Sequence, residues 1–421
     1  MLSFGDALSQ VLESADRRTK SRTSEDVQLI RLEESVGRVA ARDYVSDQKI
    51  PAFDNSAMDG FAVRSETLAT QPVPQRLRVL GTVVAGDLRI ARPESTAKEG
   101  AWEIMTGAPL PEGYDAVIKI EDVKPIRNAA GNIMEIEIAE IPPTQQYCRA
   151  AGEDIQVGTP VLYRGERISP EHLLTLAALG TAEVQVWRKI RMAVISTGKE
   201  IVTGQVRNST APYLAALMQE HRGSATFFQV GDSAEEFILL FRKILSQDFD
   251  LVITTGGVSM GKQDYVADAL TELGAYTHFH KIAVRPGKPN LFAEFDPGPV
   301  VFALPGNPVS TVVGFRFLVE AWIRRWQGRE KEKPFRMQLE EDLKKPAGLQ
   351  CFFKAEWTGE NDEQTQSSFH GKASPRVRIL PGQESFRIHP LLEARGWAVL
   401  TEAESQIAAG TWIDVYPLQD L

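Results

Sequence analysis

Residues 251–259 read Leu-Val-Ile-Thr-Thr-Gly-Gly-Val-Ser, an apolar run that ends in hydroxyl-bearing residues and glycine. Two other segments have the same pattern: residues 190–198 end in Ser-Thr-Gly, and residues 300–308 end in Pro-Gly-Asn-Pro. Nearly continuous apolar runs are typical of strands buried on both faces of a parallel sheet. The three segments therefore predict a central α/β domain with a parallel sheet between residues 186 and 330.

The ends of these strands predict a site for a phosphate-bearing ligand. Ligands of open α/β sheets bind in the crevice beyond the carboxyl ends of the strands. Glycine lets the backbone approach a ligand closely, and the helix that follows offers free N–H groups to an anion. One such turn is ordinary in a strand-to-helix connection, whereas three at one sheet edge favour an anion site. The residues concerned are Ser196, Thr197, Gly198, Gly256, Gly257, Ser259, Pro305, Gly306, Asn307 and Pro308.

Charged side chains follow the same strand ends. The acids Glu200, Asp232 and Asp264 each come shortly after an apolar run. Mg²⁺ takes one or two carboxylates together with phosphate oxygens, so these acids predict a magnesium site.

The segment 281–289 carries three cations, Lys281, Arg285 and Lys288, around a turn with two prolines. Such cations could hold a polyanion and neutralise charge that develops during phosphoryl chemistry. The alternative is a solvated turn between two strands.

Residues 53–60, Phe-Asp-Asn-Ser-Ala-Met-Asp-Gly, have neither the period of a strand nor that of a helix. They therefore indicate an ordered loop. Its two carboxylates, with an amide and a hydroxyl group, could bind a cation or a polar ligand. Equally, they could satisfy the loop's own backbone in an Asx-rich turn.

Composition narrows the class of protein. A chain of 421 residues is too long for one core and indicates two to four domains. A net charge of −9 disfavours a large nucleic-acid-binding surface. Cys148 and Cys351 are far apart, which favours a reducing compartment over a disulfide scaffold or a zinc cluster. We find no signal-peptide pattern and no apolar run of the roughly 20 residues that a membrane span needs, so we expect a cytoplasmic protein.

Patterns elsewhere predict the remaining elements. Apolar spacing predicts helices over residues 3–20, 25–40 and 169–180. Short β-like runs fill residues 60–145, and alternating strands after residue 334 indicate a terminal β-barrel or sandwich.

Two pairs of side chains could suggest a metal site or a stacking site, but the sequence favours neither function. His278 and His280 share one face of a predicted strand, but no third metal ligand is evident near them. Trp322 and Trp326 are spaced i, i+4 on a helix, which favours a core or interface position over a stacking platform.

Seven motifs in one order resemble those of the MoeA/gephyrin E-domain family, the molybdopterin molybdenumtransferases. They extend over nearly the whole chain, from about residue 3 to residue 420. The motifs are residues 53–60, 104–108, 152–154, 196–198, 256–259, 286–289 and 304–308.

The resemblance implies a homodimer of L-shaped, four-domain subunits. A helical and extended connector domain would comprise residues 1–50 and 146–185, and a β-rich domain, residues 51–145, would carry the 53–60 loop. The α/β molybdopterin-binding domain would be residues 186–330, and the C-terminal β-barrel residues 335–421. The active cleft would lie between the α/β domain of one subunit and the 53–60 region of its partner.

By the same likeness, the protein would insert molybdenum from molybdate into adenylylated molybdopterin and release AMP, with Mg²⁺ as the usual metal. Its partners would be molybdopterin adenylyltransferase and molybdoenzyme apoproteins, with no nucleic acid or membrane. Asp59 and Thr106 would face the cleft, and Asp154 would lie at the domain connection. The residues that would take part in catalysis are Asp59, Asp232, Asp264, Lys281 and Arg285; Thr106, Asp154, Lys288 and the glycine-rich turns would bind the cofactor, and Glu200, Asp232 and Asp264 the metal.

The chain departs from the family pattern around the expected cleft. Lys199 and Lys262 replace acids, residues 207–210 read Arg-Asn-Ser-Thr, and Arg285 replaces a lysine. These changes predict a site that attracts anions more and holds a cation less firmly.

Three alternatives stay open. One is a paralogue with tungstate preference, altered metal use or weak activity. Another is a binding scaffold without catalysis. The third is a nucleotide-processing enzyme like the molybdopterin adenylyltransferases, although that function leaves residues 53–60 without a role.

Overall fold

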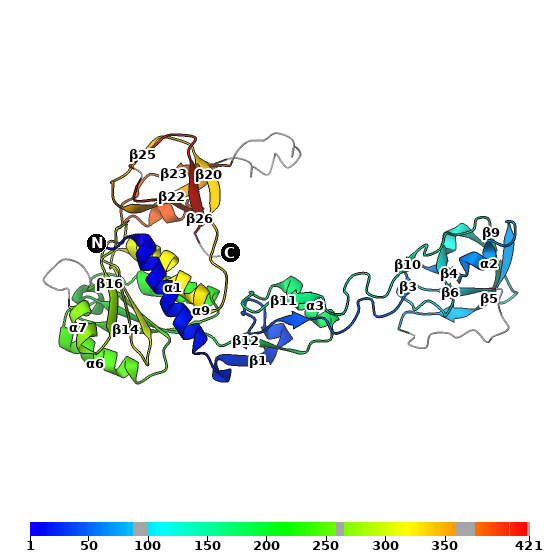
Figure 1. Ribbon diagram of the computed structural model, residues 1–421, viewed down its shortest axis with the longest axis horizontal. Helices are drawn as coiled ribbons and strands as arrows, with labels where there is room; N and C mark the ends of the chain where they lie inside the picture. The colour runs from blue at the N-terminus through cyan, green and yellow to red at the C-terminus, as the bar shows by residue number, and fades with distance from the viewer. Residues whose placement is uncertain (87–99, 258–264, 359–374, 404, 419–421) are drawn as a thin grey trace. The chain divides into compact units, whose positions relative to one another are not determined.

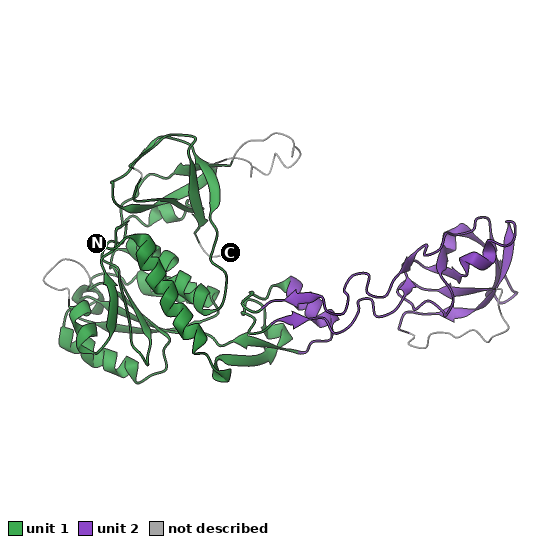
Figure 2. Cartoon of the chain, in the orientation of Figure 1, with its two compact units in different colours: residues 1–42, 164–170, 183–421 green, residues 43–163, 171–182 purple. Residues whose placement is uncertain are grey.

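The computed structural model describes residues 1–86, 100–257, 265–358, 375–403 and 405–418 (Figure 1). These residues form two compact units: unit 1 is residues 1–42, 164–170 and 183–421, and unit 2 is residues 43–163 and 171–182 (Figure 2). The boundaries of the four domains predicted above stay a prediction.

Unit 1 contains a six-stranded sheet in the order β14-β13-β15-β19-β18-β16. The first four strands are parallel, and β18 and β16 add an antiparallel edge that the sequence did not predict. The bounds are β13 Arg191–Thr197, β14 Ser224–Val230, β15 Leu251–Thr255, β16 Tyr276–His280, β18 Leu291–Glu294 and β19 Val300–Leu304. The three strands that carry the glycine-rich turns, β13, β15 and β19, are thus parallel neighbours.

Helices cover both faces of this sheet, which explains the apolar strands. In β13, Met192 and Val194 pack into one core, while Ala193 and Ile195 pack into a second core on the opposite face. Helices α1 Phe4–Lys20, α5 Thr210–Glu220, α8 Pro308–Gly314 and α9 Glu320–Trp326 contribute to the first core. Helices α6 Ala234–Leu245 and α7 Val266–Glu272 contribute to the second. Two short helical segments, α4 Lys199–Val202 and the π-helical turn Phe315–Val319, complete this region.

The tryptophan pair belongs to the first core, as predicted. Trp322 and Trp326 are 1% and 4% exposed, and their rings stack with centroids 6.1 Å apart.

The C-terminal part of unit 1 is a closed barrel, as the sequence predicted. Its strands pair in the circle β22-β23-β20-β26-β24 and back to β22. Their bounds are β20 Phe335–Leu339, β22 Gln350–Thr358, β23 Arg376–Ile379, β24 Gly396–Leu400 and β26 Trp412–Pro417, with β21 Leu343–Lys344 paired to β25 Gln406–Ile407 and a 3₁₀ turn at His389–Leu391. Strand β17 Val284–Arg285 pairs with β22, and Phe352 and Trp397 enter the first core, so the barrel is tied to the α/β sheet.

Unit 2 contains the β-rich sheet, in the order β7-β4-β6-β5-β9-β8, around a core that includes Phe61 and Ile136. The strands are β4 Gly60–Val63, β5 Gln75–Val83, β6 Ala101–Ile104, β7 Ala116–Lys119, β8 Val123–Arg127 and β9 Ile133–Ile138. Two short pairs, β2 Tyr44–Val45 with β11 Pro160–Leu162 and β3 Asn55–Ser56 with β10 Cys148–Arg149, lie in the same unit, as do α2 Ser65–Leu68, α3 Pro170–Ala178 and the 3₁₀ turn Ile120–Asp122.

The predicted helix over residues 25–40 is wrong, whereas those over 3–20 and 169–180 are confirmed by α1 and α3. Residues 27–31 form strand β1, which pairs with β12 Glu183–Trp187 and is flanked by 3₁₀ turns at Ser24–Asp26 and Leu32–Glu34. The i, i+3 spacing of Leu29 and Leu32 imitates a helix, but pairing with a strand more than 150 residues away outweighs local preference.

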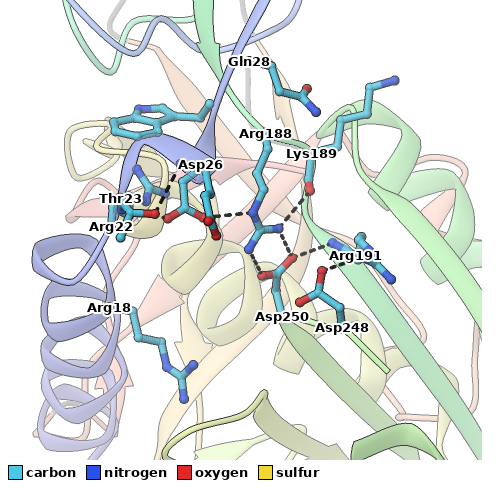
Figure 3. Close-up of polar contacts among 12 residues, drawn as sticks. Arg18, Arg22, Thr23, Asp26, Gln28, Arg188, Lys189, Arg191, Asp248 and Asp250 are labelled. Carbon is cyan, nitrogen blue, oxygen red and sulfur yellow. Dashed lines mark hydrogen bonds and ion pairs between the residues drawn. The ribbon is translucent and has the colours of Figure 1, made fainter. Parts of the chain in front are cut away.

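At the amino-terminal ends of the parallel strands, ion pairs hold the sheet to the preceding chain (Figure 3). Arg188 donates to both carboxylate oxygens of Asp250 at 2.8 and 2.6 Å and to Asp26 at 2.9 Å. Asp250 also accepts the N–H of Arg191 at 2.9 Å. The bonds to Asp250 are the largest reason why the pKa of Arg188 is raised. We call these residues the amino-edge network.

Among the described residues, no helix has the length and apolarity needed to cross a membrane.

Candidate functional site

The three glycine-rich turns of the α/β sheet surround one pocket of about 380 Å³. It opens at the carboxyl ends of β13, β15 and β19, where sequence analysis placed a ligand site. Its lining residues are Ser196, Thr197, Gly198, Glu200, Ile201, Val206, Asn208, Thr210, Asp232, Thr255, Gly256, Gly257 and Gly306. A second pocket of about 410 Å³, lined by α1, the π-helical turn and the barrel, contains none of the predicted site residues.

Close contact between the turns explains their glycines. Gly256 has φ +92°, and a Cβ atom there would lie 2.7 Å from the Thr197 hydroxyl oxygen. Gly198 has φ +129°, and its Cβ would lie 2.6 Å from a carboxylate oxygen of Glu200. A side chain at either position would therefore both strain the backbone and displace a pocket-lining group.

Asn208 belongs to the segment 207–210 that sequence analysis placed around the expected cleft, but it was not among the predicted site residues. Its amide donates to the Ser196 hydroxyl at 2.7 Å, and its carbonyl oxygen accepts the N–H of Ala211 in the first turn of α5 at 3.1 Å. The signal was the Asn-Ser-Thr run before a helical segment, since such residues satisfy free helical N–H groups. Ile201, Val206, Thr210 and Thr255 line the pocket and were likewise missed.

Two of the three predicted acids reach the pocket. Asp232 accepts the N–H of Lys199 at 3.2 Å, and Glu200 lies in the first turn of α4. Beside them, the Tyr265 hydroxyl donates to the carbonyl oxygen of Gly231 at 2.9 Å; burial, with the nearby Asp232 charge, raises the pKa of Tyr265 to about 12.

Two carboxylates next to backbone N–H groups fit Mg²⁺, which takes one or two carboxylates and fills its shell with phosphate and water oxygens. No group of three or more potential metal ligands occurs among the described residues. The predicted site residues Ser259 and Asp264, with the neighbouring Lys262, lie outside the described residues. A ring nitrogen of His278 donates to the Glu294 carboxylate at 2.8 Å, a contact within the sheet.

The three predicted cations lie on a separate turn of unit 1. Among the described residues, Lys281, Arg285 and Lys288 do not line the pocket. The N–H of Lys281 donates to Asn290, and the carbonyl of Lys288 accepts the N–H of Ile282, each at 3.0 Å, which closes the turn.

Contacts through buried residues place this cation turn beside α8. A Cβ at Gly287 would lie 3.0 Å from the Asn290 amide nitrogen and 3.7 Å from the Ser310 carbonyl oxygen. Helix α8 begins at the turn of residues 305–308. Of these four described residues, Gly306 lines the pocket, and the predicted Pro305, Asn307 and Pro308 do not.

In unit 2, the carboxylates of the loop of residues 53–60 accept backbone N–H groups, as the Asx-rich alternative predicts, and ligand binding by this loop stays a prediction. Asp54 accepts the N–H of Ala151 at 2.7 Å and so serves the backbone. Asp59 is exposed like Asp54, and one of its oxygens accepts the N–H and the hydroxyl of Thr106 at 2.6 and 2.9 Å. These two bonds lower the pKa of Asp59, so the structure brings Asp59 and Thr106 together as an anionic pair. Asp154 is exposed, and its N–H donates to Ile50.

Two family matches cover most of the chain. Residues 2–180 match the MoeA N-terminal region (domain I and II), and residues 193–325 match a probable molybdopterin binding domain. The chain is 37% identical to the molybdopterin molybdenumtransferase of Synechococcus elongatus, with 93% of this chain and 94% of the relative covered. It is 33% identical to that of Haemophilus influenzae, with both chains fully covered.

Solved structures agree with this likeness. The molybdopterin biosynthesis MoeA protein of Pyrococcus horikosii superposes with a TM-score of 0.79 at 28% identity, with both chains fully covered. On these full-length relationships, the chain belongs to the molybdopterin molybdenumtransferase (MoeA) family.

Proposed function

We propose that the protein completes the molybdenum cofactor: it transfers molybdenum from molybdate to adenylylated molybdopterin and releases AMP. The observation that carries the proposal is the pocket where Thr197, Gly256 and Gly306 bring three strand ends together beside Asp232. Relatives of the same length carry the name of this transferase activity, which supports the assignment.

The glycine-rich turns would bind the phosphates of the substrate. The Ser196 hydroxyl accepts from Asn208 and so keeps its own proton to donate, at the edge of the sheet where α4 and α8 begin. The Thr197 hydroxyl already donates to the Thr255 carbonyl oxygen at 3.2 Å, so it would help to shape the turn. Asn208 would orient the Ser196 hydroxyl through their 2.7 Å bond. Lys281, Arg285 and Lys288 would hold the oxyanion and the charge that develops on the leaving phosphate.

Glu200 and Asp232 are the described residues that would hold Mg²⁺, and we assign Asp264 to the same set. When bound, the metal ion supplies positive charge that makes the adenylyl phosphate more electrophilic. The exposed Lys199 stands where the family has an acid, so we expect weaker magnesium binding than in relatives that keep that acid.

The proposed reaction has no covalent enzyme intermediate. One oxide of molybdate attacks the adenylyl phosphorus, and the bond from that phosphorus to the bridging oxygen breaks. AMP leaves with the molybdate oxygen, the bridging oxygen stays on the molybdopterin phosphate, and two thiolate sulfurs take the vacated position on molybdenum. The dithiol loses two protons to solvent, and molybdenum stays in its oxidised state. Tungstate could follow the same path.

Asp59 and Thr106 are proposed to act on the same substrate, because the two bonds between them hold an exposed carboxylate and an exposed hydroxyl side by side. We propose that the protein works as a cytoplasmic homodimer, and that molybdopterin adenylyltransferase and molybdoenzyme apoproteins are its partners. Sedimentation equilibrium would measure the oligomeric state, and pull-down with the purified proteins would measure binding to these partners.

Single-turnover AMP release from adenylylated molybdopterin, with molybdate or tungstate and Mg²⁺, tests the proposal. We expect release that depends on the oxyanion and that is lost in Asp59→Ala. Tight binding of the substrate with no release by the wild-type protein would instead identify a scaffold. ATP-dependent adenylylation of molybdopterin would reassign the protein to the preceding step.

A further inference from the structure

Lys354 is a buried cation in the barrel that the proposed reaction does not use. It lies in the middle of β22 and is only 1% exposed. Its ammonium group donates to the carbonyl oxygens of Gly382 at 2.6 Å and Arg387 at 3.0 Å. Burial lowers the pKa of Lys354, and the nearby Glu384 partly offsets this effect. A buried charge is costly unless it is hydrogen-bonded, and these two bonds compensate the Lys354 ammonium for its lost hydration.

The two carbonyls are the ends of one loop, residues 382–387, which we call the barrel loop. It begins just after β23 ends, so at Lys354 strand β22 is paired with β24 on one side and has no paired strand on the side of β23. The Gln383 side chain fills the gap: its oxygen accepts the N–H of Lys354 at 3.0 Å and its amide donates to the Lys354 carbonyl at 2.9 Å. Lys354 therefore fixes the barrel loop with both its backbone and its side chain.

The barrel loop in turn holds the start of α8. The carbonyl of Ser385 accepts the N–H of Val309 at 3.0 Å. This N–H belongs to the first turn of α8, whose N-cap residue, Asn307, makes no side-chain cap bond. Helix α8 would otherwise leave that N–H without a partner.

The same turn of α8 leads into the pocket. Gly306 lines the pocket, and a Cβ on it would lie 3.5 Å from the Cα of Gly256 in the neighbouring turn. The Thr311 hydroxyl donates to the carbonyl of Pro305 at 2.6 Å, which holds this turn on the helix. Hydrogen bonds joined by short stretches of backbone thus connect the Lys354 ammonium to the wall of the pocket.

We propose that Lys354 is a positioning residue: it fixes the barrel loop so that Ser385 holds α8, and with it Gly306, in the binding position. Its effect on catalysis rests on the proposed function, but its effect on α8 does not. The two can therefore be measured separately.

Hydrogen exchange of residues 305–311 tests the structural part. Lys354→Met keeps the length of the side chain but cannot donate, and we expect the Val309 N–H to exchange about 10-fold faster or more, because its acceptor is no longer fixed. Lys354→Arg keeps the charge and the donors and should restore slow exchange. If Lys354→Met does not fold, Lys354→Gln, which is neutral and too short to reach both carbonyls, replaces it.

Lys345 provides the matched control. It is also buried, at 7% exposed, and its ammonium group donates to carbonyl oxygens of its own turn, Leu349 at 2.8 Å and Pro346 at 3.2 Å. Lys345→Met should destabilise the barrel without faster exchange at Val309. Unchanged exchange in Lys354→Met, or an equal increase in Lys345→Met, would overturn the proposal.

Kinetics test the second part. We expect Lys354→Met to raise the KM for adenylylated molybdopterin about 10-fold, which matches the loss of one positioned binding group, with a smaller change in kcat. A change in stability alone, with KM as in the wild type, would mean that Lys354 only supports the barrel. If the wild-type protein itself releases no AMP, the proposed function fails while the exchange experiment still decides the role of Lys354.

Discussion

At the amino-terminal ends of β13, β15 and β19, carboxylates and guanidinium groups form ion pairs. At the carboxyl-terminal ends, glycine-rich turns and a few polar side chains surround a pocket. Arg188 has two carboxylate partners, whereas Asp232 in the pocket accepts one backbone N–H. The amino edge also includes Glu294, whose backbone pairs with Val300 at the start of β19. The ion pairs that stabilise this sheet thus lie at one edge, and polar groups at the other edge are available to a ligand.

The largest expected effect is at the pocket edge. Asp232→Asn should reduce single-turnover AMP release about 100-fold or more, because it removes a charge beside the reacting phosphate. Its thermal unfolding should change little, since the side chain accepts one backbone bond. Asp248→Asn is the control at the opposite edge, where Asp248 pairs with Arg191. Equal loss of AMP release in both variants would show that the pocket edge has no special role in the reaction.

The amino edge should show the reverse behaviour. Arg188→Met leaves Asp26 and Asp250 without their partner, and we expect the free energy of unfolding to fall by about 2–3 kcal/mol. AMP release per folded molecule should stay at the wild-type value. Urea denaturation measures the first and active-site titration the second. A stability loss below about 0.5 kcal/mol, as for exposed ion pairs, would contradict a structural role for this edge.

Two glycines with nearly the same φ, one in the pocket and one away from it, separate the effect on backbone strain from the effect on substrate binding. Gly256 has φ +92° and Gly274 has φ +91°, but only Gly256 has neighbouring atoms where a Cβ would go. Alanine at either position should cost roughly 1–2 kcal/mol of stability through its left-handed conformation. Gly256→Ala should also weaken substrate binding about 10-fold, because the Cβ displaces Thr197. Calorimetry should find unchanged binding in Gly274→Ala.

The smallest expected effect is on acid stability. Burial favours a higher pKa for Glu294, but hydrogen bonds from His278, Ser14 and Arg17 outweigh it and lower the pKa to about 2. A carboxyl group with a lowered folded-state pKa stabilises the protein above its ordinary pKa of 4.5 and loses that contribution as the pH falls toward 2.

Glu294→Gln should therefore be less stable by about 1 kcal/mol at neutral pH. It should also show a flatter loss of stability between pH 4.5 and 2, measured by urea unfolding across that window. Parallel pH profiles for the two proteins would show that other carboxyl groups dominate.

Sequence predicted the pocket edge better than the amino edge, for a physical reason. The turns of Thr197 and Gly256 are local, because each glycine directly follows the strand that ends there. The partners of Arg188 lie 62 and 162 residues away, so nothing in the local pattern identifies them.

The same distinction explains the other misses. Strand β1 was predicted as a helix because its partner β12 is remote in sequence, and the antiparallel edge of β18 and β16 depends on register that no local pattern records. Asn208 carried a local signal, a helix-capping residue type, but its bond to Ser196 depends on the fold. The placement of the three cations beside α8 depends on the buried Asn290, which has no distinctive sequence context.

The packing of α1 has a consequence for the order in which the protein folds during synthesis. Residues 4–20 are made about 300 residues before some of their partners, which include Arg325, paired with Asp16, and the buried Phe317 and Trp322 of the same core. At roughly 5–20 residues per second, the ribosome needs about 15 to 60 s to reach α9. Throughout that time the apolar face of α1, with Phe4, Ala7 and Val11, lacks the part of its core that α9 supplies. The core that contains α1 can therefore be completed only after α9 has been made.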